Sequence, residues 1–128
     1  MIETKPWGFV ETIAEDDTAL TTFVIKRFSI DAHKSTELIE ISSAEIHVLA
    51  LAGFAELITL DGEGIDNLDK QFKHPQVIGK ATPSLLVTSG NRFRLVNPTI
   101  NRTSVMVIQI GKGTWKTITD HKGTLISE

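Results

Sequence analysis

The feature that most constrains the fold is the regular alternation of short apolar segments with turn-forming sequences. The segments are rich in valine, isoleucine, leucine, phenylalanine and threonine, and they cover residues 7–14, 20–30, 36–41, 45–51, 54–60, 84–88, 92–97 and 103–110. Turn-forming runs such as Glu15-Asp16-Asp17 and Asn97-Pro98 separate them. About eight strands joined at this spacing predict an all-β sandwich or barrel.

Length and charge narrow the classes of protein to which the chain can belong. A chain of 128 residues fits one domain, spanning residues 1–128, and can bury a core without a metal or a disulfide. Its net charge of −3 is spread along the sequence, whereas nucleic-acid binding needs a concentrated basic face. We therefore expect no nucleic-acid partner.

Cysteine usage and the distribution of apolar residues bear on the cellular compartment. The sequence contains no cysteine, which excludes thiolate catalysis, cysteine-ligated zinc and disulfides. The N-terminal residues lack the basic and apolar stretches of a signal peptide. No apolar run approaches the roughly 20 residues of a membrane helix. We expect a cytoplasmic protein that makes no membrane contact.

Residues 61–83 are the least regular stretch of the sequence and contain three glycines and two prolines. We interpret this stretch as a long connection between strands, which in a compact domain is often functional. The alternatives are a solvated excursion or a short strand.

The segment 45–52 is apolar on both of its faces. Alternation along a strand gives one face with Ile46, Val48, Ala50 and Ala52, and a second face with His47, Leu49 and Leu51. A strand whose outer face meets water would be polar on that side, so the sequence predicts that something covers it. We expect a homodimer; the alternative is a monomer in which the chain's own strand 7–14 covers this face through Phe9 and Ile13.

Four motifs, in order, resemble those of a known family. They are Lys5-Pro6-Trp7-Gly8, then Ile25-Lys26-Arg27-Phe28, then the turn at Gly53, and finally the run from Thr88 through Gly90 to Asn97-Pro98. Their order and spacing resemble the cupin domain of type II mannose-6-phosphate isomerases and of the sugar-nucleotide enzymes fused to them. The resemblance spans residues 5 to 115 and implies a single cupin domain, a jelly-roll-like antiparallel β-barrel. It also implies that such barrels pair through an outer sheet face.

The residues that hold a metal in that family are missing from this sequence. Counting from the motif glycines, Ile46 stands at the glutamate position, the two histidine positions fall around Ile41 to Ser43, and Phe93 stands at the third histidine position. Isoleucine and phenylalanine offer no lone pair to zinc, iron or manganese. We therefore expect no bound metal and no cofactor, and isomerase chemistry that needs a metal is in doubt.

Three arginines are candidates for recognising an anionic ligand. Arg92 and Arg94 flank Phe93, and Arg27 lies on another predicted strand. The planar guanidinium group donates two hydrogen bonds at once to a phosphate or a carboxylate. The alternative interpretation is that all three are solvated charges on strand surfaces.

Two further polar residues, Glu37 and Ser43, are candidate hydrogen-bonding groups at the mouth of the predicted barrel. Glu37 or His47 could also act as a catalytic base. His47 shares a face with Glu45, but alternation turns that face away from Ile46 and so from the family's cavity. A histidine at a subunit interface is therefore the alternative for His47.

These residues support three hypotheses about function. The first is a metal-free cupin that binds a small polar ligand such as a sugar or sugar phosphate. The second is a metal-independent sugar isomerase or epimerase, and the third is a non-catalytic dimeric accessory module. We rank ligand binding above catalysis because the sequence places no acid–base pair convincingly.

Overall fold

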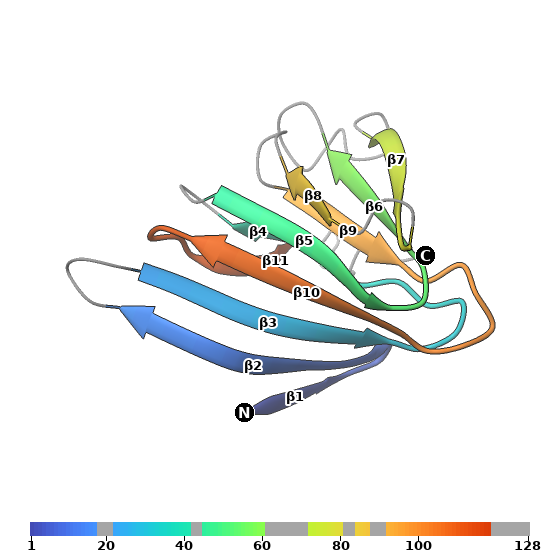
Figure 1. The fold of residues 1–128 in the computed structure, drawn as a ribbon, viewed down its shortest axis with the longest axis horizontal. Coiled ribbons are helices and arrows are strands. Elements are labelled where there is room, and N and C mark those ends of the chain that lie inside the picture. The colour runs from blue at the N-terminus through green and yellow to red at the C-terminus, as the bar shows by residue number, and fades with distance from the viewer. Residues whose placement is uncertain (18–21, 42–44, 61–71, 81–83, 88–91, 119–128) are drawn as a thin grey trace.

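A computed structural model describes residues 1–17, 22–41, 45–60, 72–80, 84–87 and 92–118. Within these residues the chain forms eleven strands (Figure 1). They are β1 (Ile2–Lys5), β2 (Gly8–Asp17), β3 (Thr22–Ile30), β4 (Leu38–Ile41), β5 (Glu45–Ala52), β6 (Ala55–Leu60), β7 (Phe72–Ile78), β8 (Ser84–Val87), β9 (Arg92–Val96), β10 (Thr103–Ile110) and β11 (Trp115–Ile118). None of the described residues forms a helix that could cross a membrane.

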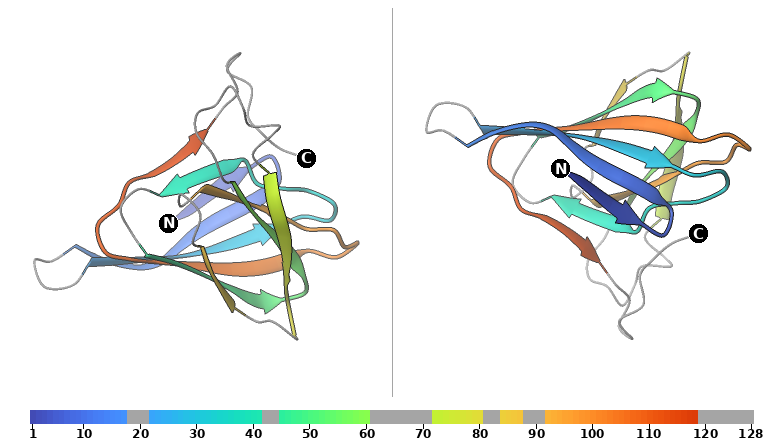
Figure 2. Two further views of the ribbon diagram at one scale, coloured as in Figure 1. Left: turned by 90° about the horizontal axis from the view of Figure 1, so that it is seen from above. Right: turned by 90° about the horizontal axis from the view of Figure 1, so that it is seen from below.

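The strands form two antiparallel sheets that face each other (Figure 2). The first sheet has the order β1-β2-β3-β10-β5-β8, and the second has the order β11-β4-β9-β6-β7. This confirms the predicted all-β, jelly-roll-like fold. The sheets are not closed into a barrel, however, because no strand pairing in the described ranges joins one sheet to the other.

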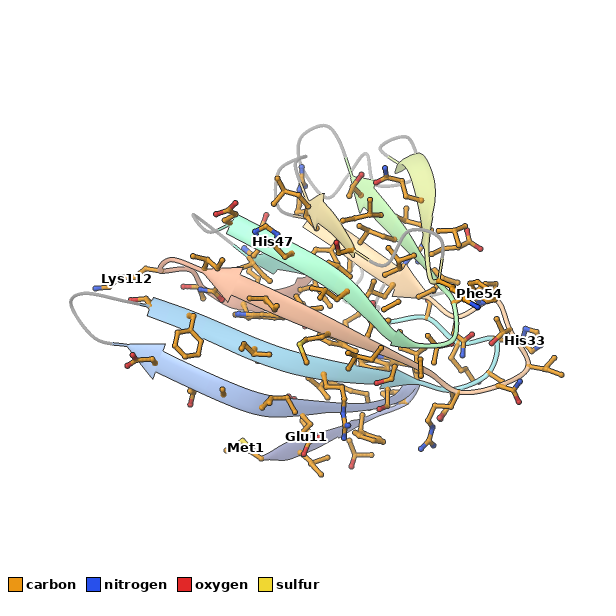
Figure 3. The ribbon with its side chains drawn as sticks, viewed as in Figure 1. Met1, Glu11, His33, His47, Phe54 and Lys112 are labelled. Carbon is orange, nitrogen blue, oxygen red and sulfur yellow. The ribbon has the colours of Figure 1, made fainter. Side chains whose placement is uncertain are left out.

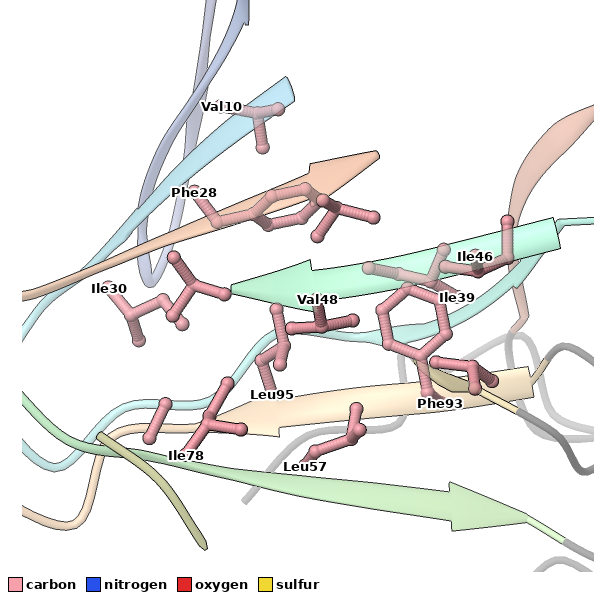
Figure 4. Packing of buried hydrophobic residues seen from close by; sticks show 14 of the residues in the cluster. Val10, Phe28, Ile30, Ile39, Ile46, Val48, Leu57, Ile78, Phe93 and Leu95 are labelled. Carbon is pink, nitrogen blue, oxygen red and sulfur yellow. The ribbon is translucent and has the colours of Figure 1, made fainter. Parts of the chain in front are cut away.

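The core lies between the two sheets and is built from the apolar side of each strand (Figure 4). Val105 and Val107 of β10 alternate with half-buried residues, and Phe93 of β9 reaches the same core from the other sheet. Each such side chain contributes roughly 1.5–3 kcal/mol when fully buried. The period of two in the sequence therefore sets which face of each sheet is inside.

All eight predicted segments contain an observed strand, but the structure adds three more, β1, β7 and β11. The interpretation of 61–83 as an irregular connection is wrong for residues 72–78, which form β7, and the alternative of a short strand is confirmed there. Pro75 masked this strand in the sequence, since proline cannot donate to a sheet ladder and is tolerated at an edge, where β7 lies. Residues 61–71 fall outside the described part of the chain.

The outer face of the six-stranded sheet is apolar at its centre. Ile25, Ile108, His47 and Leu86 stand opposite one another on four neighbouring strands. Leu51, Leu86 and Ile110 of this sheet keep nearly half of their surface exposed. The alternative in which strand 7–14 covers this face is wrong, because β2 pairs edge to edge with β3 and extends the same sheet.

A tight turn at Pro6 and Trp7 joins β1 to β2, whose first residue, Gly8, lies against the neighbouring strand β3. Gly8 has a φ of +146°, and a Cβ atom built on it would lie 1.9 Å from the carbonyl oxygen of Ser29. The Asp31 N–H donates to the Trp7 carbonyl at 2.8 Å. Only glycine allows this close approach, which leaves Trp7 buried in the core.

A second fixed point is Asn97, which is fully buried after β9. Its Nδ2 group donates to the carbonyl oxygens of Ile30, Asp31 and Asn101 at 2.7–3.1 Å. Its Oδ1 atom accepts hydrogen bonds from the N–H and the hydroxyl of Thr99. One amide side chain therefore ties the end of β3 to the connection between β9 and β10.

Candidate ligand pocket

A pocket of about 410 Å³ opens between the sheets on the side where β1 and β11 form their edges. In Figure 2, β1 lies between β2 and β4, on the side of its sheet that faces β4 and β11. The lining residues come from five strands and the residue before β4: Glu3, Lys5, Val10, Lys26, Phe28, Glu37, Ile39, Trp115, Lys116 and Thr117. Charged groups and aromatic rings thus meet in one cavity.

Glu37 is the buried carboxylate of this pocket, with 4% of its surface exposed. It precedes β4 and shares the inward-facing alternation of Ile39 and Ile41. The preceding residue, Thr36, donates its N–H to the Leu95 carbonyl and accepts the Leu95 N–H on its hydroxyl oxygen. These two bonds to β9 fix the backbone that aims Glu37 into the pocket.

The neighbours of Glu37 use only part of the hydrogen-bonding capacity of its carboxylate. Oε2 accepts a hydrogen bond of 2.8 Å from the indole N–H of Trp7, and Oε1 lies 3.8 Å from the Lys5 ammonium nitrogen. An ionised carboxylate offers about four acceptor positions. Glu37 can therefore accept further hydrogen bonds from the hydroxyl groups of a bound molecule.

Lys26 brings a positive charge to the same pocket from the inner face of β3. Its ammonium nitrogen lies 4.5 Å from the ring centroid of Trp115, a cation–π distance. Burial lowers the pKa of Lys26, and the carboxylates of Glu3 and Glu15 offset part of this effect. Within the described ranges its ammonium group makes no hydrogen bond or ion pair, so it is free to bind an anion.

A ladder of aromatic rings forms one wall beside these charges. Phe28 stacks between Trp7 and Trp115, with ring centroids 5.7 Å and 6.3 Å away. The indole N–H of Trp115 donates to the side-chain oxygen of Gln109, whose amide group donates to the carbonyls of the Gly111 and Gly113 turn. The orientation of Trp115 is therefore fixed from behind by a buried side chain.

The three arginines predicted to bind a ligand lie outside this pocket. Arg27 is on the outer face of its sheet, where it forms a 2.5 Å ion pair with Glu11. Arg92 lies 3.9 Å from Glu40 across β4 and β9. Arg94 is buried, but alternation points it away from the inward-facing Phe93 on the same strand. Arg92 and Arg94 therefore share the outer face of β9, and Arg27 lies on the other sheet.

The other predicted residues are divided between the pocket and the surface. Glu37 lines the pocket, whereas His47 lies on the outer face of β5 (Figure 3), with its Nε2 atom 3.2 Å from Glu45 Oε1. Ser43 falls outside the described residues. Of the two candidate bases, only Glu37 faces a cavity that could hold a substrate.

The residues at the family's metal positions do not fit a metal ion. Ile41, Ile46 and Phe93 are all fully buried in the apolar core. Ile46 and Phe93 lie in the space between the sheets (Figure 4). Across the ranges that the structure describes, no three His, Asp or Glu side chains are grouped closely enough to hold a metal.

The sequence interpretation missed Lys5, Lys26 and Trp115 as pocket residues. For Lys26 a signal was present, since it alternates with Phe28 and Ile30 and so shares their buried face, whereas Arg27 does not. A lysine on an apolar strand face is unusual. Lys5 and Trp115 reach the pocket from strands that the sequence did not predict.

Comparison with known proteins places the fold but not the activity. No protein-family model and no curated protein sequence matches the chain. Procruciferin, an 11S globulin from Brassica napus, is similar over 91% of this chain, with a TM-score of 0.66 and 12% identity, but the match spans only 29% of the globulin. A protein of Shewanella oneidensis has a TM-score of 0.66 and 14% identity over 92% of this chain and 78% of its own.

A third similar structure is described as a sugar phosphate isomerase of the cupin superfamily from Silicibacter pomeroyi. Its TM-score is 0.53 with 14% identity, over 94% of this chain and 74% of its own. Because the identity is so low, these similarities establish only the fold, which is of the cupin type. The narrower resemblance to mannose-6-phosphate isomerases stays a prediction.

Proposed function

We propose that this chain is a metal-free, cupin-fold protein that binds a small anionic polyhydroxy ligand of the sugar phosphate class. The observation that carries the proposal is one pocket holding both a buried carboxylate, Glu37, and an ammonium group without an ion-pair partner among the described residues, Lys26. Lys26 would bind the anionic group, and Glu37 would accept hydrogen bonds from hydroxyl groups. The proposal keeps the cytoplasmic location expected from the sequence.

The size and walls of the pocket support this class of ligand. A volume of about 410 Å³ lies within the range of about 300–1,000 Å³ that small-molecule sites occupy. The aromatic wall at Trp115 offers an apolar surface for the C–H face of a sugar ring. A sugar phosphate isomerase of the same fold lends further support.

The experiment is calorimetric titration with mannose 6-phosphate and glucose 6-phosphate, each compared with its uncharged sugar. Replacing Lys26 with methionine should weaken binding of the phosphates about tenfold or more, because a hydrogen bond to a charged group is worth about 1.5–3 kcal/mol. The neighbouring Arg27→Gln is the matched control, since it removes a charge from the same strand but on the outer face. If both variants weakened binding equally, or neither did, this pocket would not be the site.

One observation also favours a second function, a metal-independent sugar isomerase or epimerase. Glu37 could accept a proton from a carbon next to a carbonyl, and the lowered pKa of Lys26 makes its amine a better proton carrier than an exposed lysine. Exchange of substrate hydrogen with deuterated water would reveal this activity by NMR. Loss of exchange in Glu37→Gln with sugar phosphate binding retained would separate catalysis from binding.

We further propose that the chain is a homodimer that pairs through the outer face of the six-stranded sheet. Covering leucines such as Leu49 and Leu86 would contribute roughly 1.5–3 kcal/mol for each side chain that becomes fully buried. Sedimentation at tens of micromolar should give twice the 14.1 kDa mass of one chain. Leu49→Glu should yield a folded monomer, whereas Ile100→Glu, a control at an exposed loop residue, should remain dimeric. A wild-type protein of single-chain mass would refute this interface and, with it, the third hypothesis of a dimeric accessory module.

A further inference from the structure

The two acidic residues of the pocket are held very differently, and Glu3 is the exposed one. Glu3 and Lys5 lie two residues apart on β1 and both line the pocket. The Lys5 ammonium nitrogen lies 3.2 Å from Glu3 Oε2 and 3.8 Å from Glu37 Oε1. The side chain of Glu3 is 64% exposed, whereas that of Glu37 is 5% exposed. Glu3 can therefore leave Lys5 for water at little cost, and Glu37 cannot.

Glu3 also acts on the second lysine of the pocket. Among the charged groups that affect Lys26, Glu3 has the largest influence and raises its pKa, while Lys5 lowers it. Both ammonium groups thus share one nearby, movable carboxylate. Glu3, Glu37, Lys5 and Lys26 together carry no net charge when all four are ionised, and the fifth charged lining residue, Lys116, is paired with Glu40 at 3.1 Å.

We propose that Glu3 is an internal counter-ion that occupies the position of the ligand's anionic group and sets the charge preference of the pocket. This inference rests on the proposed function. With Glu3 in place, a bound dianion would give the four groups and the ligand a net charge of −2, so a phosphate group that binds Lys26 and also reaches Lys5 has to displace the Glu3 carboxylate from Lys5. An uncharged sugar has no such competitor, because its hydroxyl groups need only Glu37 and the aromatic wall. Glu3 is therefore a specificity-determining residue.

The test is to measure sugar phosphate and uncharged sugar affinities in Glu3→Gln. Removing the competing charge should tighten phosphate binding about two- to tenfold, the range expected for loss of one exposed ion pair beside the bound anion. Affinity for the uncharged sugar should not change. Glu11→Gln is the matched control, because it makes the same change of net charge but acts on Arg27 at the outer face. Unchanged or weaker phosphate binding in Glu3→Gln alone would overturn the inference.

A second measurement, without any ligand, keeps the inference separate from the proposed function. Lysine side chains labelled at Cε can be titrated by NMR in the wild type and in Glu3→Gln. The pKa of Lys26 should fall further in the variant, since Glu3 raises it. If neither protein bound a sugar phosphate, the proposed function would fail, and this titration would still decide the counter-ion role. An unmoved Lys26 pKa would refute it.

Discussion

Gly8→Ala should lower the free energy of unfolding by about 2–4 kcal/mol, through a forced backbone shift and the strain of a positive φ. The added methyl group would lie 1.9 Å from the Ser29 carbonyl oxygen, an atom of the neighbouring strand that has no freedom to rotate away. The melting temperature should fall by roughly 10 °C for a chain of this size. Thermal and urea denaturation of purified protein would measure both quantities.

Gly111→Ala is the matched control, because Gly111 also has a positive φ, +97°, but has no atom within 4 Å of the added methyl group. Gly111→Ala should lower the free energy of unfolding by only about 1 kcal/mol, because alanine is less favourable than glycine at a positive φ. The difference between the two losses of stability gives the cost of the steric contact between the added methyl group and the Ser29 carbonyl oxygen. If the two variants were equally destabilised, the close approach of Gly8 to Ser29 would contribute nothing to the cost of Gly8→Ala.

Asn97→Ala should be at least as costly, lowering the free energy of unfolding by about 3–5 kcal/mol. The substitution leaves the carbonyl groups of Ile30, Asp31 and Asn101 without the donor that they share. Each buried polar group that loses its partner costs about 1–3 kcal/mol. Urea denaturation with a constant slope would show that the effect lies in the folded state.

Asn97→Asp separates the hydrogen bonds from the shape of the side chain. Aspartate fits the same space and can still accept from Thr99, but it places a carboxylate oxygen against three carbonyl oxygens. We expect it to destabilise the protein nearly as much as alanine at neutral pH. A near-neutral aspartate variant would show that the donated bonds do not hold this junction together.

The strands that could be predicted from the sequence are mostly those with neighbours on both sides. Segments 92–97 and 103–110 became β9 and β10, which lie inside their sheets. Phe93 of β9 alternates with two arginines, and β10 has an apolar run from Val105 to Ile108. The three missed strands, β1, β7 and β11, all lie at sheet edges. An edge strand is paired on one side only, so its sequence needs less apolar alternation and tolerates a proline such as Pro75.

The candidate pocket could be predicted only in part for a related reason. Glu37 was predicted as a hydrogen-bonding group at the mouth of the barrel, and in the structure it lines the pocket, on the same face as Ile39 and Ile41. Arg27 was preferred to Lys26 on the chemistry of its guanidinium group, although alternation with Phe28 assigns the inward position to the lysine. The prediction considered side-chain chemistry but not the strand face on which each residue lies, so it selected Arg27, which lies outside the pocket.

The aromatic ladder beside the pocket also determines the optical properties of the protein. The chain has two tryptophans and no tyrosine, and both indole rings belong to the stack around Phe28. Nearly all of the near-ultraviolet absorption and fluorescence therefore arises within a few ångströms of Glu37 and Lys26. A spectrum of the unlabelled protein reports directly on this one cavity, with no signal from elsewhere to subtract.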